Sequence, residues 1–117
     1  MVYRIIVGLT LKEGATGKDL SDAFQPLRSA HVSFFGGQDK VLDYSLYVAD
    51  DGKTAIVTEG YSDGDATMGW VESDGYKENL PGILSKADIT SLDVLGEPGA
   101  ARELLEGIPG ARFCKAI

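Results

Sequence analysis

Residues 54–76 contain the feature that constrains the fold most, a strand that runs directly into a short helix. The segment up to Tyr61 has the β-branched and aromatic residues of a strand, and the polar residues 62–65 that follow are typical of a helix N-cap. The helix carries Trp70, the only tryptophan in the chain. The pattern therefore predicts a strand–helix joint with one large aromatic anchor.

A β-hairpin precedes this joint. Residues 40–49 and 53–61 are strand-like, and Asp50-Asp51-Gly52 between them is a tight-turn signal. Because successive side chains of a strand point to opposite faces, Tyr44 belongs to an apolar face and Tyr47 to a mixed polar and apolar face.

The N-terminal part predicts a strand followed by an amphipathic helix. Residues 2–11 are strand-like, and Thr16 with Asp19 three positions later indicates a capped helix start. Apolar residues then recur at helical spacing from Leu20 to Phe34. Pro26 lies within this stripe, so we expect a kink there or two shorter helices.

The complete order of elements is β-α-β-β-α-β, with further helical pieces expected at 62–73 and 76–86 and a fourth strand at 88–95. This order predicts an α+β, ferredoxin-like fold, in which a four-stranded antiparallel sheet carries helices on one face. Residues 1–96 would form this domain. We interpret residues 97–117 as a C-terminal extension, a short helix plus an arm, packed on the same domain or on a partner subunit.

Composition excludes several function classes. Eighteen acidic and eleven basic residues give a net charge of −7, so neither a nucleic acid nor a membrane surface is an expected partner. One histidine and one cysteine cannot build a zinc site within the chain, and we expect no metal. A single Cys114 suits a reducing environment, which favours a cytoplasmic location.

The uncovered face of the predicted sheet suggests a homodimer. It would hold apolar Ile6, Val41 and Tyr47 beside polar residues such as Asp43 and Asp93. A partly apolar surface of this size needs a cover, either a second subunit or a ligand. We therefore expect a twofold homodimer through this face.

Several motifs in residues 2–96 resemble the antibiotic-biosynthesis-monooxygenase-like (ABM) family of dimeric α+β barrels. The segment Thr58-Glu59-Gly60-Tyr61-Ser62-Asp63 is similar to the family's recurrent Glu-x-Tyr-x-Asp. Residues 8–14, 35–44 and 87–96 are similar to its first strand, its glycine turn with the second strand, and its closing strand. The resemblance implies a dimeric α+β barrel and monooxygenase chemistry on an electron-rich small molecule.

The sequence also departs from that family. Trp70 and Gly75 occupy places where many members have histidine, and Val7 stands where the haem-degrading branch has asparagine. Haem degradation is therefore not expected. The chain has neither a G-x-G-x-x-G motif nor a P-loop, so we expect no nucleotide cofactor, and no cofactor of another kind.

Five residues are candidates for a pocket, and no catalytic residue is assigned; the five are Tyr47, Glu59, Trp70, Tyr76 and His31. Glu59 could act as a general base in an enclosed cavity or could make a structural ion pair. Trp70 could form a pocket wall or a core anchor, and His31, on the apolar stripe, is best interpreted as a packing residue.

Two functions follow as hypotheses. The first is a cofactor-independent monooxygenase that acts on an aromatic, phenolic or quinol-like molecule in a barrel pocket. The alternative is a non-catalytic homodimer of the same fold, which binds a small molecule or is purely structural.

Overall fold

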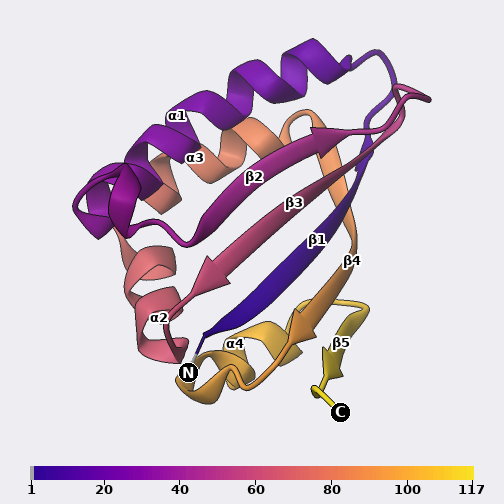
Figure 1. Cartoon of the computed structure of the whole chain (residues 1–117). Helices are drawn as coiled ribbons and strands as arrows, with labels where there is room; N and C mark the ends of the chain where they lie inside the picture. Colours follow the sequence, from indigo (N-terminus) through magenta and orange to yellow (C-terminus); the bar gives the residue numbers. More distant parts are fainter. Residues whose placement is uncertain (1) are drawn as a thin grey trace.

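A single five-stranded sheet organises the chain in the computed structural model, which describes residues 2–117 (Figure 1). The strands are β1 (Tyr3–Leu11), β2 (Asp43–Val48), β3 (Thr54–Tyr61), β4 (Ala87–Leu95) and β5 (Ala111–Cys114). The helices are α1 (Gly17–Phe35), α2 (Gly64–Glu72), α3 (Asp74–Leu84) and α4 (Arg102–Glu106), with 3-10 turns at Gln38–Lys40 and Gly99–Ala101. None of the helices in this part of the chain is long and apolar enough to cross a membrane.

The sheet has the strand order β2-β3-β1-β4-β5, which corrects one part of the predicted fold. Strands β1 to β4 pair antiparallel in the ferredoxin-like order. A fifth strand, β5, pairs parallel with β4, so the sheet is mixed and five-stranded rather than four-stranded and antiparallel. The reason is that the segment between β4 and β5 crosses over through α4, so that β5 runs alongside β4 in the same direction.

Helix α1 begins at the predicted cap. The Oγ1 of Thr16 accepts a hydrogen bond from the backbone N–H of Asp19 at 3.1 Å, and Asp19 Oδ2 accepts one from the Thr16 N–H at 2.9 Å. The helix then continues through Pro26 to Phe35, so the expected pair of shorter helices is wrong. Pro26 is exposed, and the carbonyl that loses its N–H partner can be hydrated by water.

The core lies between the sheet and the helices on one of its faces. Alternate residues of β1 point to this face and are buried: Tyr3, Ile5, Val7 and Leu9. Helices α1 and α2 contribute buried residues opposite them, including Phe24, Leu27 and Trp70. Period-2 burial in the strand and helical periodicity in α1 therefore meet in one apolar layer, as binary patterning requires.

An irregularity in the β1–β4 pairing changes which residues of β4 face the core. The register shifts between Gly8 and Leu9, so that Ser91 lies opposite Gly8 and Ile89 lies opposite Leu9. A β-bulge of this kind breaks the alternation of faces. Ile89, rather than Thr90, therefore shares the inner face with Leu92.

The segment after Gly96 packs against the rest of the chain. Leu105 of α4 is buried in the core, and Ala101 in the preceding turn is fully buried. Gly64, the first residue of α2, lies directly against the backbone of Pro98 and Ala100. The division into a 1–96 domain and an extension stays a prediction, since β5 also belongs to the main sheet.

The contact at Gly64 yields a prediction. A Cβ at this position would meet the Pro98 carbonyl oxygen and would lie 2.7 Å from the Ala100 nitrogen and 2.9 Å from the Ala101 nitrogen. Because these are backbone atoms, the turn itself must move. We expect Gly64→Ala to lower the free energy of unfolding by about 1–3 kcal/mol, measured by urea denaturation.

Gly82→Ala is the matched control, since Gly82 also lies in a helix but its Cβ would come no closer than 3.9 Å to Ala23. It should be neutral or stabilising by up to about 1 kcal/mol, because alanine favours a helix over glycine. Equal effects of the two substitutions would contradict the tight packing at Gly64.

Candidate functional site

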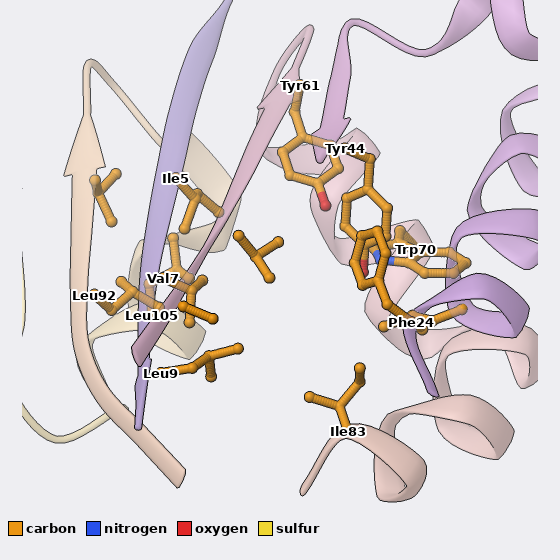
Figure 2. Close-up of a cluster of buried hydrophobic side chains, with 14 of the residues drawn as sticks. Ile5, Val7, Leu9, Phe24, Tyr44, Tyr61, Trp70, Ile83, Leu92 and Leu105 are labelled. Carbon is orange, nitrogen blue, oxygen red and sulfur yellow. The ribbon is translucent and has the colours of Figure 1, made fainter. Parts of the chain in front are cut away.

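A cavity of about 490 Å³ lies between the inner face of the sheet and the helices. This volume falls within the range of about 300–1,000 Å³ typical of small-molecule sites. Figure 2 shows some of the side chains that line the cavity, among them Val7 of β1 and Phe24 of α1. The lining is drawn from strands β1 to β4, from all four helices and from the turn after α4. Most of it is aliphatic or aromatic, and its polar side chains are Tyr44, Glu59, Thr67, Glu72 and Tyr76.

Glu59 provides the buried carboxylate of this cavity. It lies on the inner face of β3, opposite Tyr44 of β2 and Ile5 of β1. The hydroxyl of Tyr61 donates a short hydrogen bond to Glu59 Oε1. Burial raises the pKa of Glu59 to about 7, although the Tyr61 hydrogen bond acts in the opposite direction; the negative charge of Asp43 adds to the increase. The group can therefore exchange a proton near neutral pH.

Three tyrosines surround this carboxylate, and each remains protonated near neutral pH. Burial and the nearby charge of Glu59 raise the pKa of Tyr76 to about 12. The same two causes raise the pKa of Tyr44 and the pKa of Tyr61 well above the usual value. The site thus combines one group that can accept a proton with phenol hydroxyls that can donate hydrogen bonds.

His31 is buried beside the cavity without lining it. Its ring stacks on Tyr44, with ring centroids 3.8 Å apart and planes 5° apart, and the ring of Trp70 meets it edge-on at 4.8 Å. Burial lowers the pKa of His31 to about 4, so the imidazole is neutral at physiological pH. His31 also lines a separate cavity of about 100 Å³, together with residues that include Phe35.

The other two candidate residues also lie outside the main cavity. Trp70 is fully buried in the core, where it packs edge-on against Tyr76 with ring centroids 5.5 Å apart. Tyr47 is 59% exposed on the opposite face of the sheet. The structure therefore brings Glu59 and Tyr76 together in the cavity, places Trp70 and His31 behind its wall, and leaves Tyr47 away from it.

Three further residues belong to this site that the sequence analysis did not name as candidates. Tyr44 was expected in the core alone, yet it both packs there and lines the cavity. Tyr61 supplies the hydrogen bond to Glu59, and Glu72 stands exposed in the cavity lining. Tyr61 follows Glu59 by two positions in the same strand and so points to the same face, and this spacing is the signal that could have assigned it to the site.

Residues 2–117 contain no group of three or more His, Cys, Asp or Glu side chains that could hold a metal ion. The polar groups of the cavity are oxygen atoms that serve as hydrogen-bond donors and acceptors. Their arrangement suits proton transfer to or from a bound organic molecule.

Glu59 and His31 should give opposite pH dependences to the free energy of unfolding. The pKa of Glu59 rises from 4.5 to about 7 on folding, so the stabilisation present below pH 4.5 is lost as the pH rises through 7. The pKa of His31 falls from 6.5 to about 4, so the stability present above pH 6.5 is lost as the pH falls through 4. Each full effect amounts to about 3 kcal/mol.

Urea denaturation of single variants separates the two effects. In Glu59→Gln only the His31 effect remains, so acidification from pH 6.5 to 4 should destabilise this variant more than the parent protein. In His31→Phe only the Glu59 effect remains, so raising the pH from 4.5 to 7 should destabilise it more than the parent. Identical pH slopes in the parent protein and both variants would contradict these pKa shifts.

Several solved structures share this fold, among them the following three. SnoaB, a cofactor-independent oxygenase from Streptomyces nogalater, is 11% identical with a TM-score of 0.65, over 78% of this chain and 89% of that chain. MupZ from Pseudomonas fluorescens is 14% identical with a TM-score of 0.66, over 99% of this chain and 90% of that chain. A protein from Caulobacter crescentus CB15, assigned as an antibiotic biosynthesis monooxygenase, is 15% identical with a TM-score of 0.64, over 80% of this chain and 84% of that chain.

These comparisons confirm the predicted resemblance to ABM-type structures at the level of the fold. No protein-family model and no curated protein sequence matches the chain. The similarity to MupZ extends through the C-terminal segment, which includes α4 and β5. At these identities the likeness establishes an α+β fold of this type, and the chemistry must be argued from the residues of this chain.

Proposed function

We propose that this protein is a cofactor-independent monooxygenase that acts on an aromatic, phenolic or quinol-like molecule bound in the main cavity. The observation that carries the proposal is Glu59, a carboxylate in an apolar cavity with its pKa raised to about 7. A general base is most effective when its pKa lies near the working pH. The shared fold with SnoaB, described as a cofactor-independent oxygenase, supports the same chemistry.

In this proposal the cavity walls hold the substrate and Glu59 removes its proton. The aliphatic side chains of β1 and the aromatic ring of Phe24 pack on a flat ring and exclude water. The substrate hydroxyl donates a hydrogen bond to Glu59 and then transfers its proton to it. Tyr76 stabilises the resulting phenolate with its own hydroxyl, which stays protonated because its pKa is about 12.

The chemical step needs only the phenolate and molecular oxygen. The phenolate passes an electron to oxygen, and a ring carbon that carries a hydrogen then bonds to one oxygen atom, which gives a peroxide anion. This anion takes the proton held on Glu59 and becomes a ring hydroperoxide. Ionised Glu59 then removes the hydrogen of that ring carbon while the O–O bond breaks, and hydroxide leaves with this proton as water, so that a quinone remains. The sum is phenol plus O₂ giving quinone plus water, and each product receives one of the two atoms of O₂.

We further propose that the chain forms a homodimer through the face of the sheet that the helices leave uncovered. On this face Tyr47 is 59% exposed and Ile56, opposite it in the register, is 45% exposed. Burial of this pair against a second copy would remove apolar surface from water. Analytical ultracentrifugation tests the assembly, and a monomer at every concentration would overturn it.

A cytoplasmic location stays a prediction from the single cysteine.

The alternative is a non-catalytic protein of the same fold that binds a small aromatic molecule or serves as a structural dimer. The observation that favours it is the burial of Trp70 and His31, which act in packing and not in the cavity. This alternative requires the absence of turnover, either with a ligand bound in the cavity or without any ligand.

Oxygen consumption distinguishes the two functions. Purified protein is incubated with a panel of quinols, anthrones and naphthols in ¹⁸O₂, and oxygen uptake is recorded together with product mass. We expect a quinone that contains one labelled oxygen atom, with the second label in water. Uptake at the background rate for every member of the panel, with ligand binding retained, would favour the binding protein.

A further inference from the structure

The charges around the main cavity are all of one sign. Its lining contains two carboxylates, Glu59 and Glu72, and none of the lining residues is a lysine, arginine or histidine. Glu59 lies in the apolar interior of the cavity, whereas Glu72 is exposed. The whole chain carries a net charge of −7, which adds to the negative potential.

The basic side chains on the helices that form the wall lie outside the cavity lining; they are Lys18 and Arg28 of α1, Lys77 of α3 and Arg102 of α4. Arg102 of α4 lies over the ring of Phe113 at 4.4 Å and forms an ion pair with Glu106 at 3.6 Å. Lys18 of α1 forms an ion pair with Asp22 at 2.7 Å. Neither of these cations contributes to the cavity lining.

An anionic group would therefore lose its hydration in this cavity without gaining a counter-charge. Burial of an unpaired charge in apolar surroundings is strongly unfavourable, and a second negative charge near Glu59 adds repulsion. A neutral hydroxyl group is favoured instead, because it can donate a hydrogen bond to the carboxylate of Glu59. Among residues 2–117 its hydrogen bond comes from Tyr61 to Oε1, which leaves Oε2 to accept one from a ligand.

We propose that the cavity selects an uncharged aromatic molecule that offers a hydroxyl to Glu59, and that it rejects relatives of that molecule carrying a carboxylate. The inference rests on the proposed function for its choice of an aromatic hydroxyl compound. It narrows the substrate class to neutral phenols and quinols, such as esters or decarboxylated forms of aromatic acids. The reaction that supplies such a substrate must leave no free carboxylate on it.

A matched set of probes separates charge from size. Binding of 2-naphthol, 6-hydroxy-2-naphthoate and the methyl ester of that acid is measured by isothermal titration calorimetry at pH 8, where Glu59 is ionised. We expect the ester and 2-naphthol to bind with similar affinity and the carboxylate to bind about 100-fold more weakly or not at all. The ester has the bulk of the carboxylate without its charge, so it controls for steric exclusion.

Substitution of Glu59 tests the cause of this selectivity. Glu59→Gln removes the repelling charge and should reduce the ratio of ester to carboxylate affinity about tenfold. Glu78→Gln, an exposed position of α3 outside the lining, should leave the ratio unchanged. Binding of the carboxylate within threefold of its ester, or failure of both neutral probes to bind, would overturn the inference.

This binding test is independent of turnover. Selective binding of the neutral probes with no oxygen uptake would uphold the ligand class and overturn the monooxygenase. Oxygen uptake with equal binding of the ester and the carboxylate would uphold the monooxygenase and overturn the ligand class.

Discussion

Replacing Trp70 by Ala is expected to lower the free energy of unfolding by about 3–5 kcal/mol, the usual cost of truncating a buried Trp or Phe to Ala. The side chain is fully buried, and its ring contacts His31, Tyr44 and Tyr76. Its removal would leave an apolar void directly behind the wall of the cavity. Urea denaturation followed by circular dichroism at fixed protein concentration measures the loss.

Trp70→Phe is the matched variant, since it keeps an aromatic ring in the same place. It should cost clearly less than the alanine variant, because it removes only part of the buried ring. A loss below about 1 kcal/mol for Trp70→Ala would show that the site does not depend on this residue for packing. In that case the interpretation of Trp70 as a core anchor would be wrong.

The second large effect is expected at Glu59. If it acts as the general base, Glu59→Gln should reduce the rate of oxygen uptake about 10²–10⁴-fold, because glutamine has the same shape but cannot take a proton. Activity of the parent protein should rise with pH through about 7, the pKa of this carboxyl group. Steady-state rates measured across this pH range check both statements.

Tyr61→Phe provides a control for the electrostatics of this carboxylate. The Tyr61 hydrogen bond holds the pKa of Glu59 lower than burial alone would set it. Its loss should therefore move the rise in activity to higher pH while activity itself persists. An unchanged pH profile in Tyr61→Phe, or full activity in Glu59→Gln, would assign the proton transfer to another group.

Local signals in the sequence predicted most of the elements. Thr16 and Asp19 identify the start of α1 because a capping box depends on only four neighbouring residues. The continuation of α1 through Pro26 was not predicted, since it depends on whether the backbone carbonyl that loses its N–H partner faces water. Burial of that turn is a property of the folded chain rather than of its local sequence.

Long-range pairing explains what the sequence did not reveal about the sheet. β5 has only four residues, and no local feature specifies β4 as its partner or a parallel direction. The bulge opposite Gly8 likewise results from the pairing of two distant strands. Strict alternation from Leu92 would place Thr90 in the cavity, whereas the bulge places Ile89 there.

The candidate site was predictable to the extent that side-chain direction follows from strand alternation. Alternation places Glu59 with Tyr61 on the inner face of β3, and the structure agrees. Tyr76 required knowledge of how α3 packs against the sheet. Trp70 could not be assigned in this way, because the size of an aromatic residue does not indicate whether it lines a cavity or packs behind the cavity wall.

The position of Trp70 also gives the protein a built-in optical reporter. It is the only indole in the chain, so all tryptophan emission comes from one known place. Its ring is fully buried and lies 5.5 Å from the ring of Tyr76, which lines the cavity. A ligand in the cavity that absorbs at the emission wavelength should quench this emission without changing the wavelength of its maximum. Unfolding should instead shift the maximum to longer wavelength. One fluorophore therefore distinguishes an occupied protein from a denatured one.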